Sequence, residues 1–376
     1  MKIGVVTTSY PRAAGDPAGG FVQGHVAALR ALGHEVDVIA AGERDELVAE
    51  PEAPTGTRIA RLRGGDLFYR GGAPDRLERE PLRAGLAGAS FSARLAATLA
   101  FHAPRWDLAI AHWLAPSALA FTAARLGRRR PPLLAIAHGG DVHTLRRARL
   151  LAPALAALRA TGARLAFVSD ELRAIAAAAV PARWLAGAIV QPMGLALDRF
   201  GAIPRAPSDP PTIVIASRLV QVKGVDVAIA AMQHVRRPVH LVIAGDGPER
   251  ATLAARAADA PRVTFLGAVD TRRRDELLGR ASVVVVPSRI LPNGRSEGTP
   301  LIALEALAAG VPVVASAVGG LREVRSLALV PPDDPHRLAQ TIDDVLAHPP
   351  PAATLRGSVA DLGWPEVARR LLAATP

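Results

Sequence analysis

Two carboxylates flank an apolar stretch in the segment SEGTPLIALEALAAG, Ser296–Gly310, where seven residues separate Glu297 from Glu305. Thr299 suits a helix N-cap and Pro300 the first helical position, so we expect a helix that stops at the final glycine. Glu305 is the only polar residue inside that helix. Its buried carboxylate needs a hydrogen-bonding partner, either paired ribose hydroxyls or a neighbouring arginine. Glu297 precedes the helix, where it either faces a ligand together with backbone amides or is a plain surface glutamate.

A second segment whose residues could take part in chemistry is ASRLVQVKG, residues 216–224, which follows an expected strand. Arg218 and Lys223 fall on the strand-to-helix loop, and Gly224 opens the next helix. Two cations and a helix N-terminus directed at one point suit a diphosphate. A basic loop that only faces water is an equally weighted alternative.

The glycine pair in AGDGPE, residues 244–249, permits a tight turn or a close approach of the backbone to a ligand. It does not complete the dinucleotide fingerprint G-x-G-x-x-G, because Arg250 stands in place of the third glycine. A Walker loop is missing as well, since no glycine-rich run precedes Lys223. The sequence therefore disfavours a dehydrogenase.

In the first half, the segment AHGGDVH, residues 137–143, ends a strand and places His138 where open α/β sheets bind ligands. The pair Gly19–Gly20 follows the first strand and forms a second loop of this kind before a helix. His138, Asp141 and His143 suggest a metal, but their spacing alone does not supply a convincing ligand set. We expect no metal site.

The elements that position these residues follow from the alternation of apolar strand-like runs with helical patterns, which indicates stacked β–α–β units. In the first half the expected strands are 2–7, 35–40, 108–111, 133–138, 165–169 and 188–191, with a helix at 21–32. In the second half they are 212–216, 240–244, 263–266, 283–286, 312–315 and 327–330. Residues 41–88 are expected to be a partly irregular insertion, and 203–211 a proline-rich linker.

This pattern predicts two doubly wound α/β domains facing a cleft. The first comprises residues 1–203 and the second 204–363. An amphipathic C-terminal helix, 364–376, is expected to pack back on the first domain.

Composition narrows the class of protein. The chain contains no cysteine, which removes disulfides, thiolate metal sites and a cysteine nucleophile. Its first apolar run is too short for a signal peptide, and no uninterrupted apolar stretch reaches membrane-spanning length. We therefore expect a cytoplasmic protein. Aromatic residues make up only 4% of the chain and form no aromatic–basic platform, which argues against a nucleic-acid partner.

The charge is unevenly distributed. Of the net charge of +11, residues 1–204 contribute +8, from 25 basic and 17 acidic residues, and the remainder contributes +3. The excess indicates a peripheral contact of the first domain with an anionic membrane or a charged acceptor. Solvated helix faces in an arginine-biased chain are the alternative.

Taken in order, the motifs resemble glycosyltransferase family 4, a group of retaining enzymes with the GT-B fold of two Rossmann-like domains. The resemblance covers nearly the whole chain and is carried by GGFV, GHEVDVI, HGGD, PMG…DRF, SRL…KG, AGDGP, VVPS, EGTPLIALEALAAGVPVV and VGGLREV. It implies a first domain that binds the acceptor and a second that binds a nucleotide sugar. Metal-independent transfer is expected, because cations and helix dipoles of the protein stabilise the leaving group.

The resemblance also assigns roles to single residues. It implies that His138, Glu297, Arg218 and Lys223 act in catalysis. The donor diphosphate would be held by Gly20, Arg218, Lys223, Thr299, Pro300 and Leu301. The ribose would be held by Glu305, the donor sugar by His138, Glu297 and Gly298, and the base by Gly267, Ala268 and Val269. No cofactor is implied beyond the donor itself, a UDP- or GDP-linked sugar from which a hexosyl unit is transferred.

Several alternatives stay open at this point. A GT-B-fold nucleotide-sugar epimerase and a non-catalytic nucleotide-sugar-binding protein are the rival functions. The acceptor is a polysaccharide, a lipid-linked sugar or a small molecule. Arg289 and Arg295, in the loop before Glu297, either contact phosphate or face water.

Overall fold

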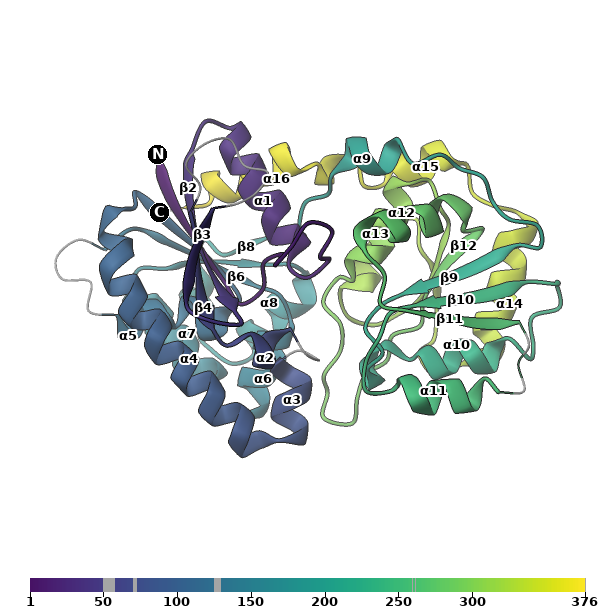
Figure 1. The fold of residues 1–376 in the computed structure, drawn as a ribbon, viewed down its shortest axis with the longest axis horizontal. Helices are drawn as coiled ribbons and strands as arrows, with labels where there is room; N and C mark the ends of the chain where they lie inside the picture. Colours follow the sequence, from purple (N-terminus) through teal and green to yellow (C-terminus); the bar gives the residue numbers. More distant parts are fainter. Residues whose placement is uncertain (50–57, 70–72, 125–129, 259, 261, 376) are drawn as a thin grey trace. The chain divides into compact units, whose positions relative to one another are not determined.

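The computed structural model describes residues 1–49, 58–69, 73–124, 130–258, 260 and 262–375. The chain divides into two compact units, which Figure 1 shows as ribbons. The first contains Met1–Gly194 and Trp364–Pro376, and the second contains Leu195–Gly363. Both termini therefore belong to the first unit.

The first unit is built on an eight-stranded sheet with the order β3-β4-β2-β1-β5-β6-β7-β8. Its strands are β1 (Lys2–Thr7), β2 (Glu35–Gly42), β3 (Glu46–Ala49), β4 (Arg58–Arg63), β5 (Leu108–His112), β6 (Leu133–Ala137), β7 (Arg164–Phe167) and β8 (Ile189–Val190). Neighbouring strands are parallel except β3 and β4. The central strands β5 and β6 are buried along their whole length, as expected for parallel strands covered on both faces.

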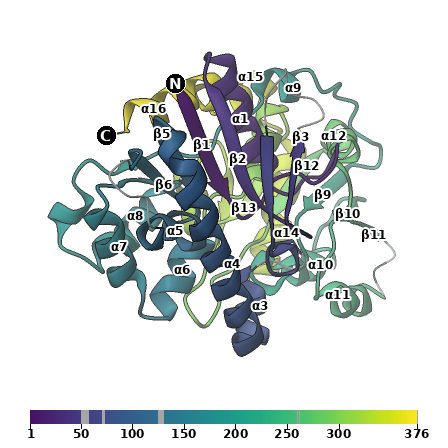
Figure 2. The same cartoon turned by 60° about the vertical axis from the view of Figure 1, so that its left-hand side comes forward.

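The helices of this unit are α1 (Gly20–Ala31), α2 (Gly65–Phe68), α3 (Ala73–Arg79), α4 (Pro81–His102), α5 (Ala120–Ala123), α6 (Gly140–Arg147), α7 (Leu151–Ala160), α8 (Asp170–Ala177) and α16 (Trp364–Ala373). Three short segments, η1 (Ala103–Arg105), η2 (Leu114–Ala118) and η3 (Ala182–Leu185), complete it. The last helix, α16, runs back onto α1, and Figures 1 and 2 both show the two helices side by side.

The second unit has a six-stranded parallel sheet with the order β11-β10-β9-β12-β13-β14. Its strands are β9 (Thr212–Ala216), β10 (His240–Ala244), β11 (Val263–Gly267), β12 (Val283–Val286), β13 (Val313–Ser316) and β14 (Ala328–Val330). Its helical elements are α9 (Leu197–Gly201), η4 (Gln221–Lys223), α10 (Val225–Ala231), α11 (Arg250–Arg256), α12 (Thr271–Arg280), α13 (Leu301–Ala308), η5 (Gly319–Glu323), α14 (Pro335–Ala347), α15 (Ala352–Gly357) and η6 (Ala360–Leu362). One apolar core lies under α9, α12, α13 and α15, and a separate core lies under α10, α11 and α14. The sheet is therefore covered on both faces.

Each sheet reverses its strand order once. In the first unit the chain builds outward from β1 through β2, then returns to place β5 on the other side of β1. In the second unit it builds outward from β9 through β10 and β11, then returns to place β12 beside β9. Such reversals leave a crevice at the carboxyl ends of the two strands involved, where ligands of open α/β sheets bind.

All twelve strands expected from the sequence are present, with ends that differ by at most two residues. The helix after Glu297 begins one residue later than expected. Pro300, not Thr299, is its N-cap residue, and no side chain caps it. Gly310 ends this helix as expected, with a φ of 74° that favours glycine.

The segment 41–88, expected to be a partly irregular insertion, contains β3, β4, α2, α3 and the start of α4. Arg61 of β4 is only 6% exposed, and its guanidinium donates to the backbone carbonyls of Tyr10, Pro11 and Ala41. Residues 50–57 and 70–72 of the insertion lie outside the described residues.

The units divide nine residues before the position expected from the prolines, at 194/195 instead of 203/204. The Leu195 N–H donates to the Leu362 carbonyl at 2.7 Å, and Phe200 and Ile203 lie in the core under α13. The proline-rich segment is attached to the second unit, because the Arg205 guanidinium donates to the carbonyl of Ala281 at 2.8 Å.

Helix α4 is the long blue helix that runs down the front of the first unit in Figure 2. Among the described residues, the segment Pro81–Arg105 is the one helix with the length and apolarity to cross a membrane, and 22% of its apolar window is buried. Its buried residues, Ala84, Phe91, Leu95 and Leu99, form a stripe toward β4 and α5. Such a stripe is typical of a helix that packs on a globular core.

Candidate functional site

The reversal point of the second sheet brings together two of the sequence motifs. Lys223 follows β9 and Glu297 follows β12, and the Lys223 Nζ atom lies 2.8 Å from a Glu297 carboxylate oxygen. Only 18% and 15% of these two side chains are exposed, so the pair is partly shielded from water. Two motifs 74 residues apart in sequence thus meet where a ligand of this sheet would bind.

Glu305 lies one helical turn inside α13 and has the arginine partner that the sequence left as an alternative. Arg274 of α12 places a guanidinium nitrogen 3.3 Å from the Glu305 carboxylate. Burial raises the pKa of this carboxyl group, while the charge of Arg274 opposes the rise. The ion pair supplies the compensation that a buried carboxylate needs, and the guanidinium holds one of the two carboxylate oxygens.

The two glycines of AGDGPE are required by a neighbouring loop. A Cβ atom on Gly245, whose φ is 144°, would lie 1.7 Å from the Ser217 carbonyl oxygen, and one on Gly247 would lie 2.3 Å from that of Leu219. The Leu219 N–H donates to the Asp246 carbonyl at 2.9 Å. The tight packing of these loops fixes the backbone that carries Arg218 and Lys223.

Glycine is required at position 224 for a similar structural reason. Its φ is 59°, and a Cβ atom there would lie 2.0 Å from the carbonyl oxygen of Pro287, just after β12. The residue therefore lets the loop after β9 lie directly against the segment that leads to Glu297. It also precedes α10, as the sequence predicted.

The other residues to which the resemblance assigned roles in this unit lie at the same edge of the sheet. Gly267 ends β11, Ala268 and Val269 follow it, and the Gly267 carbonyl accepts from Gly245 N–H at 2.7 Å. Gly298 accepts from Gly320 N–H at 2.9 Å, which connects the loop before α13 to η5. Arg218, next to Ser217, is exposed.

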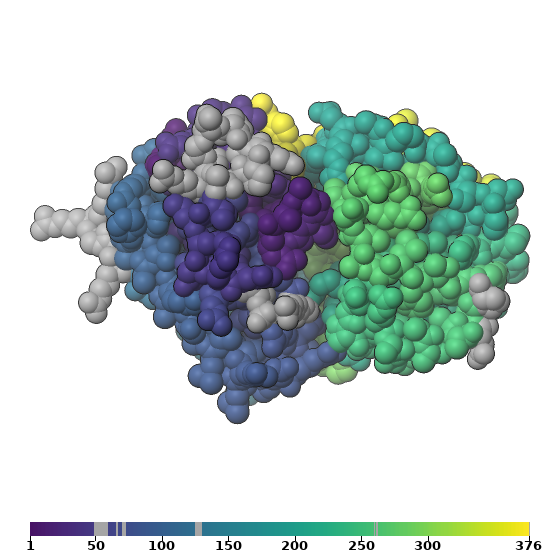
Figure 3. Space-filling view, viewed as in Figure 1, coloured from purple at the N-terminus to yellow at the C-terminus, as the bar shows by residue number. Residues whose placement is uncertain are grey.

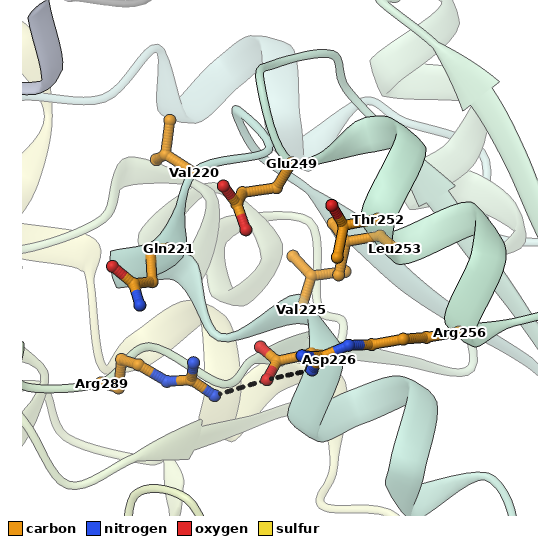
Figure 4. Close-up of a pocket in the computed structure, with 9 residues that line it drawn as sticks. All are labelled: Val220, Gln221, Val225, Asp226, Glu249, Thr252, Leu253, Arg256 and Arg289. Atoms are coloured by element: carbon orange, nitrogen blue, oxygen red, sulfur yellow. Dashed lines mark hydrogen bonds and ion pairs between the residues drawn. The ribbon is translucent and has the colours of Figure 1, made fainter. Parts of the chain in front are cut away.

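Arg289 is tied to two carboxylates. Its guanidinium lies 2.9 Å from Asp226 and 2.7 Å from Asp333. Figure 4 shows Arg289 and Arg256 pointing to Asp226 at one side of a small pocket. Arg295 is 8% exposed, so it does not face water either.

The pocket in Figure 4 is lined by Val220, Gln221, Val225, Asp226, Glu249, Thr252, Leu253, Arg256 and Arg289. It borders the loop that carries Lys223 but does not include that residue. The ion pairs at its side join α10 to α11 and to the loop after β12, and the Arg289 N–H donates to the Val222 carbonyl of η4 at 2.9 Å. We therefore interpret these contacts as supports of the loops that carry Lys223 and Glu297.

In the first unit, Asp141 organises the residues near His138. Its buried carboxylate accepts hydrogen bonds from the backbone N–H groups of His138, Gly139, Val142 and Leu114, at 2.6 to 3.1 Å. Burial raises the pKa of this carboxyl group, and the four N–H donors oppose the rise. Because its oxygens are engaged with the backbone, Asp141 holds the loop after β6 and is not arranged as a metal ligand.

His138 belongs to a row of three histidines from different elements. His112, the last residue of β5, places its Nδ1 atom 3.0 Å from the Nε2 atom of His138. His25 of α1 places its Nδ1 atom 3.1 Å from the Nε2 atom of His112. Burial lowers the pKa of all three, to about 4 for His25 and about 3 for His138, so the row is neutral at pH 7.

Aromatic rings enclose this row. The centroid of the His138 ring lies 4.8 Å from that of Trp113 and 5.1 Å from that of Phe21. The Trp364 ring of α16 stacks on the His25 ring with a centroid distance of 5.3 Å. Trp113 has a φ of 72°, a strained value for a residue with a side chain. Strain of this kind is concentrated at functional sites.

The loop after β1, which leads to Gly20 at the start of α1, forms the purple projection on the surface of the first unit in Figure 3. Gly20 is the first residue of α1, and a Cβ atom there would meet nothing within 4 Å. The base of the loop is fixed by Arg61 and by Tyr69, whose hydroxyl donates to the Tyr10 carbonyl at 2.8 Å. Sequence reasoning missed both residues, because nothing in their local pattern separates an anchoring arginine or tyrosine from a solvated one.

The arrangement can bind an anion and hold a polar ligand. In the second unit the Lys223–Glu297 pair lies at the sheet reversal point, and the Arg274–Glu305 pair joins α12 to α13. In the first unit the neutral His112 ends β5 and the neutral His138 follows β6. Among the described residues, no group of three or more His, Cys, Asp and Glu side chains is placed to hold a metal ion.

Comparison with known families gives two matches. The model described as Glycosyltransferase Family 4 matches residues 19–204, and the model described as Glycosyl transferases group 1 matches residues 210–348. A D-inositol 3-phosphate glycosyltransferase of Xylanimonas cellulosilytica is 35% identical over 181 residues, 44% of this chain and 42% of that protein. A GDP-mannose-dependent phosphatidylinositol monomannoside mannosyltransferase of Mycobacterium tuberculosis is 39% identical over 148 residues, 35% of this chain and 38% of that protein. The matched part thus spans less than half of either relative.

Solved structures share the fold over the full length. Sucrose-phosphate synthase from Thermosynechococcus elongatus has a TM-score of 0.72 and 23% identity, with 100% of both chains covered. HepE from Anabaena, solved with UDP and glucose, has a TM-score of 0.70 and 17% identity, with 99% of this chain and 98% of that chain covered.

Proposed function

Because the chain belongs to glycosyltransferase family 4 and has the GT-B fold, we propose that it transfers a hexosyl unit from a UDP- or GDP-sugar to an acceptor. In this proposal the product keeps the anomeric configuration of the donor, and no metal ion takes part. The contact between Lys223 and Glu297 is the observation that carries the proposal, because it joins a cation and a carboxylate at the sheet reversal point.

On the donor side, Arg218 and Lys223 neutralise the diphosphate as it leaves, together with the backbone amides of Thr299 and Leu301. A charge-assisted contact to phosphate is worth about 1.5–3 kcal/mol. Glu305 accepts from the ribose hydroxyls with the oxygen that Arg274 does not hold. Glu297 and Gly298 hold the sugar, and Gly267–Val269 line the base.

The proposed reaction uses these positions as follows. The bond between the anomeric carbon and the distal phosphate oxygen breaks, and the acceptor oxygen bonds to the same carbon from the same face. The acceptor proton passes to the departing phosphate oxygen, which gains negative charge as the bond breaks. His138 stands at the sugar, and Gly20 lets the loop after β1 approach the phosphates. This step needs no carboxylate nucleophile and no cofactor.

The relatives support a nucleotide-sugar donor without deciding the base. The mycobacterial relative is named as GDP-mannose-dependent, whereas HepE was solved with UDP. The acceptor is a polysaccharide, a lipid-linked sugar or a small molecule. The mycobacterial relative is named for a phosphatidylinositol monomannoside, and this name favours the lipid-linked class.

The test is release of nucleoside diphosphate from a panel of UDP- and GDP-hexoses with candidate acceptors, in excess EDTA. Lys223→Ala is expected to lower transfer roughly 10- to 100-fold, whereas Lys2→Ala, which removes the other lysine of the chain, leaves it unchanged. NMR of the product is expected to show the donor's anomeric configuration. An inverted anomer, or activity that needs added magnesium or manganese, contradicts the proposal, and epimer formation without acceptor indicates the epimerase instead.

A lipid-linked acceptor would place the enzyme in the cytoplasm at the inner face of the membrane. At the start of α4, Leu82 and Leu86 are 84% and 74% exposed, and Arg83 between them is exposed as well. Exposed leucines flanked by arginine suit the surface of an anionic bilayer. The excess charge of the first 204 residues acts in the same direction.

Vesicle flotation tests this location. The protein is expected to bind vesicles containing phosphatidylglycerol more strongly than neutral ones, with weakening by salt. The variant with Leu82→Ser and Leu86→Ser should lose binding, whereas Leu329→Ser, at an exposed leucine of the second unit, should not. Equal partitioning to neutral and anionic vesicles contradicts the electrostatic part of the proposal.

A further inference from the structure

The row of His25, His112 and His138 has a direction that follows from counting its protons. Each neutral imidazole carries one N–H, and each of the two contacts in the row needs one donor and one acceptor. The row can therefore donate from His25 toward His138 or from His138 toward His25. The two directions put the proton of His138 on different ring nitrogens.

The end of the row at His25 distinguishes these directions. The Nε2 atom of His25 is buried and has no hydrogen-bond partner among the described residues. If the row donated toward His25, this atom would carry an orphaned buried N–H, which is rare and costly in proteins. If the row donates toward His138, the same atom is a bare acceptor beneath the stacked Trp364 ring. The second direction avoids the orphaned donor.

The direction of donation determines which ring nitrogen of His138 is left for a ligand and whether it carries a proton. His112 Nδ1–H donates to His138 Nε2, so the single proton of His138 is on Nδ1. The ring is held at this orientation by Trp113 and Phe21. Nδ1 is thus the ring nitrogen left for a ligand, and it can only donate to one.

We propose that His25 and His112 are positioning residues that act through His138, holding it as the Nδ1–H tautomer so that it donates a hydrogen bond to a hydroxyl oxygen of the donor sugar. The role of the sugar rests on the proposed function, whereas the tautomer does not. The neutral state that this arrangement requires agrees with the lowered pKa values of the three rings. Mutation of a residue behind a functional histidine commonly changes its tautomer and orientation.

NMR of the full-length protein labelled with ¹⁵N-histidine tests the tautomer directly, because protonated and bare ring nitrogens resonate in separate ranges. The ten histidines are few enough to resolve, and the His138→Gln variant assigns the relevant signals by their loss. We expect His138 to carry its proton on Nδ1 at pH 7. In His112→Phe the Nε2–H tautomer should appear, whereas His112→Asn, whose side-chain amide can donate near the former Nδ1 position, should retain Nδ1–H.

Kinetics then test the coupling to transfer. His112→Phe should lower kcat roughly tenfold, while the Kd for free nucleoside diphosphate stays unchanged because the second unit binds it. His112→Asn should recover kcat to within about threefold of the wild type. His234→Asn, at an exposed histidine of the second unit, is the matched control and should change neither value.

The outcomes separate the two proposals. A His138 proton on Nε2 in the wild type overturns the inference, as does a tautomer that stays the same in His112→Phe and His25→Phe. His25→Phe keeps a ring against Trp364 and so provides a second variant if His112→Phe does not fold. The expected NMR pattern in a protein without transferase activity would support the histidine row and contradict the proposed function.

Discussion

Lys223 is one of only two lysines among the 45 lysine and arginine residues of the chain. Arginine is the default cation of this sequence, so a lysine at the sheet reversal point has a specific physical meaning. Its ammonium is a compact charge that donates in three directions, unlike the planar fork of arginine. It can keep its contact with Glu297 and still donate to a phosphate oxygen.

Substitutions of the two glutamates in the segment Ser296–Gly310 are expected to have different effects on binding and on turnover. In the proposed function Glu305 contacts the ribose, so Glu305→Ala should weaken nucleoside diphosphate binding about 10- to 100-fold. Glu297 would lie beside the reacting sugar, so Glu297→Ala should lower kcat with little change in that affinity. Calorimetric Kd values and kcat measured side by side check this division. Equal losses of affinity in both variants would contradict it.

Glu305→Ala also leaves the Arg274 guanidinium without its carboxylate, which destabilises a partly buried site. The double variant Glu305→Leu with Arg274→Leu controls for this effect, since replacing both partners of a buried pair is often neutral. It should recover the stability lost in Glu305→Ala without recovering nucleotide affinity. Recovery of affinity would mean that Glu305 serves structure alone.

At the scale of elements, the glycines of the second unit determine how closely its loops pack. Gly245→Ala would place a methyl group 1.7 Å from the Ser217 carbonyl at a φ of 144°. We expect a loss of at least about 2 kcal/mol in the free energy of unfolding. Gly85→Ala, in α4 with open space around the added atom, should instead gain about 0.5–1 kcal/mol. Urea denaturation checks both, and a neutral Gly245→Ala would contradict the packing described.

The elements were largely predictable from the sequence because buried parallel strands read as short apolar runs between helical patterns. Side-chain contacts between elements far apart in the sequence were not predictable in this way. The resemblance assigned Lys223 and Glu297 to the same ligand but did not predict their contact. The partner of Glu305 was only one of two alternatives, since Arg274 lies in a helix with several exposed arginines. His25 and His112 gave no signal either, because a lone histidine in an apolar helix or strand is ordinary. The unit boundary was misplaced, since Phe200 and Ile203 look no different from linker-flanking residues until their core is seen.

At the scale of the whole molecule, the buried histidines make stability depend on pH. Above pH 6.5 the row is neutral in both folded and unfolded chains. Below pH 6.5 the histidines of the unfolded chain bind protons, whereas His25 of the folded chain stays neutral, because burial lowers its pKa to about 4. Each such histidine should therefore remove about 1.4 kcal/mol of stability per pH unit as pH falls from 6.5 toward 4. Denaturant midpoints across this window check the slope.

His25→Phe provides the comparison for that slope. It keeps an apolar ring against Trp364 and removes one titrating group, so its stability should fall less steeply than that of the wild type between pH 6.5 and 4. The raised pKa values of Asp141 and Glu305 act in the opposite direction, since the folded chain then holds their protons more tightly. They are common to both proteins, so they cancel in the difference. Identical slopes would contradict a buried neutral His25.

The central claim is that the Lys223 loop binds the donor diphosphate without a metal ion, and the scarcity of lysine makes it directly measurable. Reductive methylation with ¹³C-formaldehyde labels Lys2, Lys223 and the N-terminal amine, and Lys223→Arg identifies the Lys223 signal. Titration with UDP and GDP in excess EDTA is expected to shift the Lys223 signal saturably with one of the two nucleotides and to leave Lys2 in place. A Lys223 signal that responds to neither nucleotide, or only after magnesium or manganese is added, would contradict the account.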